Sequence, residues 1–408
     1  MNTQALNPYS NTSTLNTLTR PSPNTSLILR IQNIWDRFKY TIGGILRDTF
    51  LLPLFQKLSF KDEEQKLQEE LYFANFWNLI HPIYPELLYH KEIKETFIKR
   101  TEQVPIVIDD QKLEVSCLVI ESKEDHPLEI QKPYTFIHVL GNLSTISNNI
   151  MSTYPFIVSY LKQKKENPSM PPVKFILISQ YNTTVVDGEN QNSTYKPKTL
   201  NEAGLILEEC IKGLAKNYGK ADQLVAHSIG CIVFTSSLKY FDTSSNYIPK
   251  HIHLDRGPSS ILKLSHRSFG GWLYFPLALM TGWALDFGEE VANFCNKTRL
   301  TRRGNYAPSI LVSAAERDHI FPGDTNLYLS PHVQNLRRAK EITILPFTPP
   351  LQWASNFKAL HAASNATFSS RHLPSKYQNQ SFIKEDETLA DAVIRRSLPQ
   401  DRVAQKNL

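Results

Sequence analysis

The chain has 408 residues, 41% hydrophobic and 21% charged, so it can bury a sizeable core and is not disordered as a whole. Its formal net charge of +6 is small for this length, and lysines and arginines are scattered among acidic residues. This distribution argues against a protein that tracks nucleic acid. Four widely spaced cysteines in apolar surroundings predict buried reduced thiols and no metal site: Cys117, Cys210, Cys231 and Cys295.

The first 102 residues differ from the rest of the chain. Residues 1–26 are rich in Asn, Ser and Thr and are predicted to form a flexible leader. They lack the basic start and apolar run of a signal peptide, which predicts a cytoplasmic protein; export by a route without a signal peptide is the alternative. Residues 27–102 are predicted to be a helical segment. Its basic, amphipathic part, residues 27–60, either packs on the main domain or makes peripheral contact with a membrane.

Residues 103–372 carry an alternating pattern of strands and helices. Runs 104–108 and 113–120, joined by 109–112, predict an antiparallel hairpin. Short apolar strands then alternate with amphipathic helices, which indicates an α/β fold with a mostly parallel central sheet and helices on both faces. The predicted strands are 134–140, 173–179, 223–227, 251–255, 309–314 and 341–346, and the predicted helices are 148–162, 200–218 and 231–240.

Two further segments complete the predicted organisation. Residues 257–305 form an insertion that we expect to be lid-like. Within it, residues 270–285 carry no charge, but they are too short and too interrupted by Pro276 and Gly282 to predict a membrane span. A core helix, a lid over an acyl-binding cleft and a membrane-dipping segment stay open for this stretch. Residues 373–408 are predicted to be a C-terminal tail.

Ser228 stands where the predicted strand 223–227 gives way to a helix. Ala226 and Gly230 flank it, and small side chains there let neighbouring backbone approach a sharply turned serine. This small-x-Ser-x-Gly turn resembles the nucleophile elbow of the α/β-hydrolase superfamily, with Ala226 in place of the commoner glycine. The leading hairpin, and an elbow after the fifth strand, match the order of that fold. A plain turn capped by Ser228 is the alternative.

The resemblance implies a catalytic triad in the chain order serine, acid, histidine. Asp318 follows the predicted strand 309–314 and precedes an apolar run that ends in proline, as the family's acid does; Asp255 is the rival acid. His361 is the first histidine after the last predicted strand and matches the base. Its distance from that strand is long for the family, and His372 is the alternative.

The resemblance also implies two backbone N–H groups that stabilise a developing oxyanion. One belongs to Ile229, directly after the nucleophile. The other belongs to Asn142 or Leu143, because Gly141-Asn142 resembles the oxyanion loop of part of the superfamily, although Leu140 stands where that loop has histidine. Residues 181–188 stand where the family has a loop that rims the site.

These motifs predict a serine hydrolase that cleaves a carboxylic ester through an acyl-enzyme, with no cofactor and no metal. The uncharged stretch 270–285 favours a lipid or other acyl substrate, while thioesters and amides stay open. No nucleic-acid partner is expected, and residues 27–60 or 270–285 are the candidates for membrane contact. The alternative is a catalytically silent α/β-hydrolase-like binding protein, such as an exported bacterial effector.

Overall fold

The computed structural model describes most of the chain from residue 93 onward. The described residues are 93, 95–123, 132–140, 150–186, 195, 197, 199–243, 246–260, 263, 285–301, 307–316, 318, 323–348, 365–378 and 382–398. The predicted leader 1–26 and the membrane-contact candidate 27–60 therefore lie outside them, and so does nearly all of 270–285.

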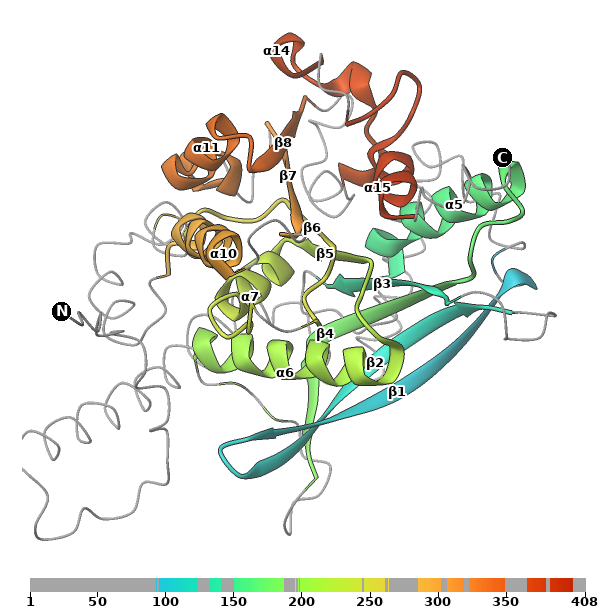
Figure 1. Cartoon of the computed structure of the whole chain (residues 1–408), viewed down its shortest axis with the longest axis vertical. Coiled ribbons are helices and arrows are strands. Elements are labelled where there is room, and N and C mark those ends of the chain that lie inside the picture. Colours follow the sequence, from blue (N-terminus) through green and yellow to red (C-terminus); the bar gives the residue numbers. More distant parts are fainter. Residues whose placement is uncertain are drawn as a thin grey trace, which may run out of the picture.

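An eight-stranded sheet forms the centre of the described structure, in the order β1-β2-β4-β3-β5-β6-β7-β8 (Figure 1). Pairs β1–β2 and β2–β4 are antiparallel, and all later neighbours are parallel. The strands are β1 Phe97–Ile108, β2 Gln111–Ser122, β3 Tyr134–Val139, β4 Val173–Val185, β5 Gln223–His227, β6 His251–Asp255, β7 Ser309–Ala315 and β8 Ile342–Phe347. The predicted mostly parallel sheet with a leading hairpin is confirmed.

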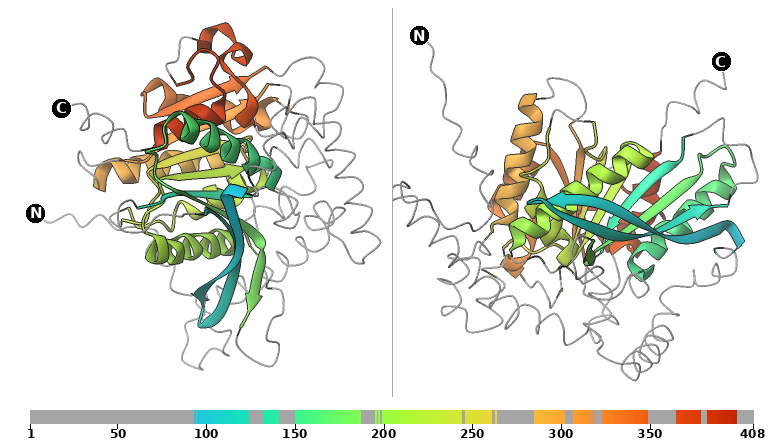
Figure 2. Two further views of the ribbon diagram at one scale, coloured as in Figure 1. Left: turned by 90° about the vertical axis from the view of Figure 1, so that its right-hand side faces the viewer. Right: turned by 90° about the horizontal axis from the view of Figure 1, so that it is seen from below.

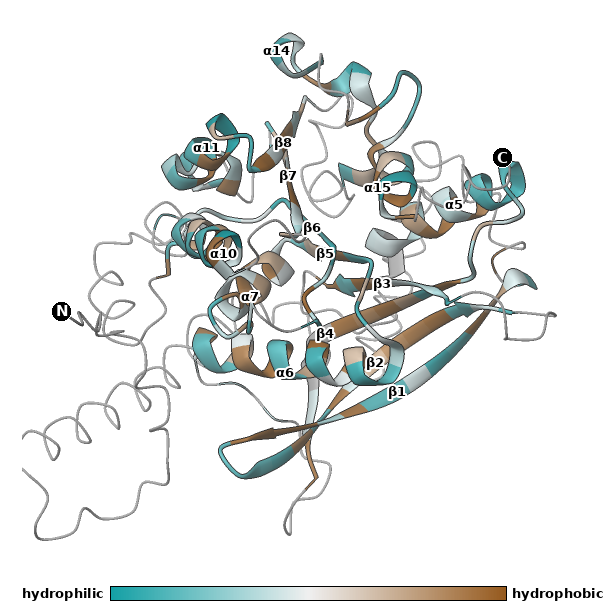
Figure 3. Ribbon diagram, in the orientation of Figure 1, coloured by the Kyte–Doolittle hydropathy of each residue, from teal (hydrophilic) through white to brown (hydrophobic). Residues whose placement is uncertain are grey.

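Helices cover both faces of this sheet (Figure 2). On one face, α6 Leu200–Tyr218, α7 Ile229–Ser237, α10 Phe287–Thr301 and α11 Pro331–Arg338 pack on one hydrophobic core. On the other face, α5 Ile150–Glu166 and α15 Leu389–Ser397 pack on a second core. Figure 3 shows the apolar residues gathered along the strands. Strands β3 and β5 are buried at every position, which explains why most of their residues are apolar.

The leading hairpin turns more tightly than the sequence predicted. Asp109 and Asp110 take φ values of 48° and 65°, which is the geometry of a two-residue type I′ turn. The pairing therefore continues to Ile108 opposite Gln111. Strand β1 also begins at Phe97, ahead of the predicted boundary at residue 103, because its first residues pair with the end of β2.

The prediction of a loop at residues 181–188 is wrong for residues 181–185, because β4 continues as a strand to Val185. Its last residues pair with β2, with Thr183 opposite Val115 and Val185 opposite Leu113. An irregularity between Val115 and Cys117 separates this pairing from the main part of the sheet. Polar residues form a strand here because β2, which belongs to the long hairpin, supplies the partners for their backbone hydrogen bonds.

The predicted lid-like insertion contains a structural helix. Helix α10 packs against α7 and α11 and buries Phe287, Val291 and Phe294 in the core. Residues 285–301 therefore belong to the body of the fold, and residues 264–284 lie outside the described part. Within the described ranges, no helix is long and apolar enough to span a membrane.

The predicted C-terminal tail also belongs to the domain. Helix α15 packs against α5, with Leu389, Val393 and Ile394 at most 2% exposed. The side chain of Gln163 donates to the carbonyl of Asp391 at 3.0 Å. The domain thus reaches at least Leu398. The charged residues Lys384 to Glu387 precede this helix, and the sequence was therefore assigned to a tail. The helix is amphipathic and packs in the second core.

All four cysteines are buried, and none of them forms a disulfide, as predicted. The Sγ atoms of Cys117 in β2 and Cys210 in α6 lie 3.8 Å apart.

Candidate active site

Ser228 occupies a strained turn between β5 and α7. Its φ of 52° and ψ of −116° lie outside the regions that ordinary residues adopt, which costs on the order of 1–3 kcal/mol. The turn is fixed by its backbone, since the Ser228 amide donates to the Asp255 carbonyl at 2.9 Å. The residue is 5% exposed. A serine with a strained backbone between a strand and a helix has the geometry of a nucleophile elbow.

Gly230 is required for this turn by close packing. A Cβ atom at residue 230 would lie 2.3 Å from the carbonyl oxygen of Val139 and 2.9 Å from that of Leu140. The end of β3 therefore lies directly against the first turn of α7. The chain that continues from Leu140 leads to Asn142 and Leu143, which are outside the described residues.

Ile229 begins α7, immediately after the elbow. Backbone N–H groups in the first turn of a helix have no partner within the helix and lie at the positive end of its dipole. The Ile229 amide is therefore suited to stabilise negative charge close to Ser228.

Asp318 follows β7 and is 2% exposed. Its backbone amide donates to the Ala315 carbonyl at 3.1 Å, which closes a tight turn at the end of the strand. Strands β5, β6 and β7 are parallel neighbours, so Asp318 lies at the same edge of the sheet as Ser228. His361 lies outside the described residues, so its position stays a prediction.

The rival acid, Asp255, lies at the end of β6 inside a buried hydrogen-bond network. It is fully buried, and its Oδ2 lies 2.9 Å from Nδ1 of His227, the residue that precedes Ser228. Its Oδ1 accepts from Ser313 Oγ at 2.7 Å and from Asn365 Nδ2 at 2.7 Å. Asp255 thus joins three segments of the chain, which is the arrangement of a structural carboxylate.

Asn365 links this network to a second buried charge. Its Oδ1 accepts from Nε and Nη2 of Arg256, at 3.0 and 2.8 Å, and the Arg256 side chain is fully buried. Asn365 comes four residues after His361 in the sequence. The network therefore attaches Asn365 to the end of β6, next to the Ser228 turn.

The charge state of Asp255 follows from its partners. Burial alone would raise the pKa of this carboxyl, but the hydrogen bond from His227 and the charges of His227 and Arg256 hold its pKa well below the usual range. Asp255 is consequently ionised at neutral pH and can only accept hydrogen bonds.

His372, the alternative base, has a local structural role. Its Nδ1 lies 3.2 Å from both the amide and the Oγ of Ser369, which closes a capping box on the short helix Ser370–His372. Burial lowers the pKa of His372. One ring nitrogen is thus engaged within its own turn.

Two other histidines, His138 in β3 and His253 in β6, are fully buried and neutral. Burial lowers the pKa of His138 to about 3 and that of His253 to about 4. Nδ1 of His138 is 2.7 Å from Thr153 Oγ1, and Nε2 of His253 is 2.7 Å from Ser313 Oγ. Both rings therefore belong to the buried polar layer beside the network of Asp255.

These neutral imidazoles predict a loss of stability in mild acid. In the unfolded chain a histidine has a pKa of about 6.5, so below that pH the unfolded chain binds protons that the folded protein does not. The free energy of unfolding should fall as pH drops from about 6.5 toward 4, by up to about 1.4 kcal/mol per pH unit for each histidine. Urea unfolding at pH 7 and pH 5 measures this loss. A variant with His253→Gln should show a smaller difference between the two pH values than wild type. Equal stability at both pH values would contradict the assignment.

No local sequence pattern marks Asn365, Arg256 or His227 as residues that support the site. The one available signal was Asp255-Arg256, a pair of charges directly after a buried apolar strand. Among the residues that the structure describes, no group of three or more His, Cys, Asp or Glu side chains could hold a metal ion.

The strand order, the antiparallel leading hairpin and the serine elbow after β5 define a protein with the α/β-hydrolase fold, as the sequence resemblance implied. No protein-family model and no curated protein sequence matches the chain.

Solved structures to which the chain is similar include hydrolases of three organisms. An esterase of Pyrococcus furiosus has 15% identity, with 66% of this chain and 90% of that chain covered and a TM-score of 0.36. An acylaminoacyl peptidase of Pyrococcus horikoshii has 15% identity, 71% and 42% coverage and a TM-score of 0.41. A lipase/esterase of Lactobacillus plantarum has 12% identity, 60% and 88% coverage and a TM-score of 0.37. This chain thus spans less than half of the peptidase.

Proposed function

We propose that the protein is a serine hydrolase that cleaves a carboxylic ester. Ser228 attacks the ester carbonyl, His361 takes the serine proton and delivers it to the leaving group, and Asp318 orients His361. The amides of Ile229 and of Asn142 or Leu143 stabilise the tetrahedral oxyanion. Water then releases the acyl group by the same route in reverse.

The observation that carries this proposal is the strained backbone of Ser228 at the start of α7. A serine that only capped a helix would have an extended backbone, and its side chain would accept from an amide in the first turn. Ser228 has a φ of 52°, and its side chain makes no such capping bond. The packing of Gly230 against the end of β3 supports the oxyanion assignment, because it places Leu140, which precedes the proposed oxyanion residues in the sequence, next to the elbow.

A lipid or other acyl substrate is the proposed class. Its support is the uncharged stretch 270–285, which precedes α10 in the sequence and lies almost wholly outside the described residues. An acyl chain is the kind of group that an apolar surface near a reactive serine binds.

A fluorophosphonate probe tests the nucleophile directly. The wild-type protein should be labelled, and Ser228→Ala should not, because only an activated serine attacks phosphorus at a useful rate. Ser116→Ala is a matched control, since Ser116 lies in β2 and its hydroxyl contacts Gln103. The proposal fails if folded wild-type protein is never labelled, or if Ser228→Ala is labelled as fast as wild type.

One observation favours the alternative of a silent binding scaffold, namely the 5% exposure of Ser228. A small methyl fluorophosphonate and a long-chain one distinguish the two functions. Labelling by either probe supports the hydrolase. If neither reacts with the folded protein, the scaffold alternative holds.

A further inference from the structure

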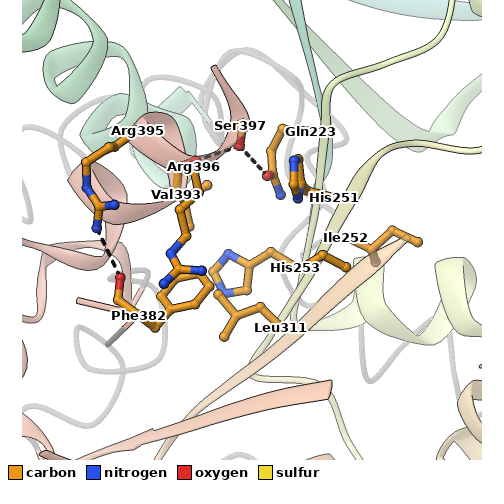
Figure 4. A pocket seen from close by; sticks show the side chains of 11 residues that line it. Gln223, His251, Ile252, His253, Leu311, Phe382, Val393, Arg395, Arg396 and Ser397 are labelled. Atoms are coloured by element: carbon orange, nitrogen blue, oxygen red, sulfur yellow. Dashed lines mark hydrogen bonds between the residues drawn. The ribbon is translucent and has the colours of Figure 1, made fainter. Parts of the chain in front are cut away.

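A cavity of about 390 Å³ lies at the edge of the sheet opposite Ser228, where β5, β6 and β7 begin (Figure 4). Its walls come from the first residues of these strands and from the last turn of α15. A hydrogen bond from Ser397 Oγ to Gln223 Oε1, at 2.7 Å, joins α15 to β5. The volume lies in the range of small-molecule sites and corresponds to roughly a dozen water molecules. The cavity is therefore larger than a single small ion.

Two arginines contribute to the wall of this cavity. Arg395 and Arg396 both line it, and the described residues of the lining include no carboxylate. Arg395 pairs with Glu387, which is not part of the lining. The two carboxylate oxygens of Glu387 lie 2.5 and 2.7 Å from the Arg395 guanidinium. Arg396 stacks over the Phe382 ring, with its Cζ 4.2 Å from the ring centroid. Burial and the neighbouring charge of Arg395 lower the pKa of Arg396. An anion bound beside this guanidinium would offset both effects.

His253 adds a buried polar atom to the same wall. The ring extends from β6 into the region of Arg396 and Phe382 (Figure 4). It is fully buried, and its Nδ1 has no hydrogen-bond partner. A buried imidazole nitrogen without a partner costs about 1–3 kcal/mol, so it favours a ligand that supplies one.

The hydrogen bonds of the network determine what this nitrogen needs. Asp255 is ionised and accepts from Ser313 Oγ, so the Ser313 proton points to Asp255. Ser313 Oγ must then accept from Nε2–H of His253, which lies 2.7 Å away. The neutral ring therefore carries its hydrogen on Nε2 and presents a lone pair at Nδ1. A ligand must donate a hydrogen bond to that nitrogen while its negative charge meets Arg396.

We propose that this cavity binds a protonated phosphate group, and that the ligand is a small phosphate ester or hydrogen phosphate itself. Anionic phosphate oxygens accept from the Arg396 guanidinium, and the P–O–H hydrogen is donated to Nδ1 of His253. Sulfate has the same shape and a similar charge, but it carries no hydrogen at pH 6, where about half of a phosphate monoester still does, so it cannot make the second contact. The site is independent of the proposed ester hydrolysis.

Isothermal titration calorimetry of the intact protein at pH 6 and constant ionic strength tests the site, because about half of a phosphate monoester carries the P–O–H hydrogen at that pH. Inorganic phosphate should bind saturably, with an affinity at least about tenfold above that of sodium sulfate. Glycerol 1-phosphate is the second probe: tighter binding than inorganic phosphate identifies an ester as the ligand, and equal binding identifies the free ion. Neither measurement involves Ser228.

Matched variants place the binding in the cavity. Arg396→Gln should weaken phosphate binding by at least about tenfold, whereas Arg371→Gln should not change it. Both variants lose one positive charge, but Arg371 is exposed and pairs with Asp386 away from the cavity. His253→Gln keeps a donor for Ser313 and removes Nδ1, so it should abolish the preference for phosphate over sulfate. Thermal unfolding of each variant checks that the domain stays folded.

Three results would overturn the proposal. They are the absence of saturable phosphate binding to wild-type protein, equal affinities for phosphate and sulfate, and equal weakening by Arg396→Gln and Arg371→Gln.

Discussion

Replacing Asp318 with asparagine is expected to lower kcat for a p-nitrophenyl ester by about 10⁴-fold, the loss that removal of a triad carboxylate causes in serine hydrolases. An amide cannot stabilise the imidazolium that forms when His361 takes the serine proton. It also favours the wrong tautomer of the imidazole. Asp318 is 2% exposed, and asparagine has almost the same volume, so the fold should tolerate the change.

The same substitution at Asp255 is the matched control, because Asp255 lies at the end of the neighbouring strand. Asp255→Asn should lower kcat by less than about tenfold, because this side chain supports the elbow through His227 and is not expected to contact the base. Steady-state kinetics of the two purified variants, at a temperature where both are folded, decide between the acids. A larger loss of kcat for Asp255→Asn than for Asp318→Asn would transfer the role of the acid to Asp255.

Truncating Asp255 to alanine should cost about 3–5 kcal/mol of unfolding free energy, the typical effect of removing one partner from a buried ionic network. The variant removes a negative charge that interacts with the fully buried Arg256 guanidinium. It also leaves Ser313 Oγ and Asn365 Nδ2 without their acceptor. Urea unfolding followed by circular dichroism measures the loss.

Glu209→Ala provides the control for this second prediction. Glu209 pairs with Lys212 one turn along α6, and both side chains are partly exposed. Its removal should cost less than about 1 kcal/mol, as is usual for exposed ion pairs. If Asp255→Ala costs no more than Glu209→Ala, the network around Asp255 contributes no special stability, and its assigned role is wrong.

Local sequence patterns predicted the central part of the fold closely. The predicted helix 200–218 and strands 223–227 and 251–255 coincide with α6, β5 and β6. Each is a short run of one periodicity, bounded by polar or small residues, so local information suffices. The hairpin and the position of Ser228 after the fifth strand followed from the same reasoning.

Features that depend on distant partners were not predictable in this way. Asn365 contacts Asp255 across 110 residues of sequence, and no local pattern distinguishes it from a polar loop residue. Helix α15 was assigned to a tail because its flanks are charged, although its apolar face fills a core made by α5. The second half of β4 is polar and forms a strand only because the long hairpin offers it an edge.

The position of α15 has a consequence for synthesis of the protein. Tyr134 and Phe136 in β3 belong to the same buried cluster as Ala390 and Val393 in α15, yet the ribosome makes β3 long before that helix. Until α15 has been translated, this face of the sheet lacks part of its apolar cover. The nascent chain therefore carries an exposed apolar surface on this face of the sheet until α15 has been translated and has packed against it.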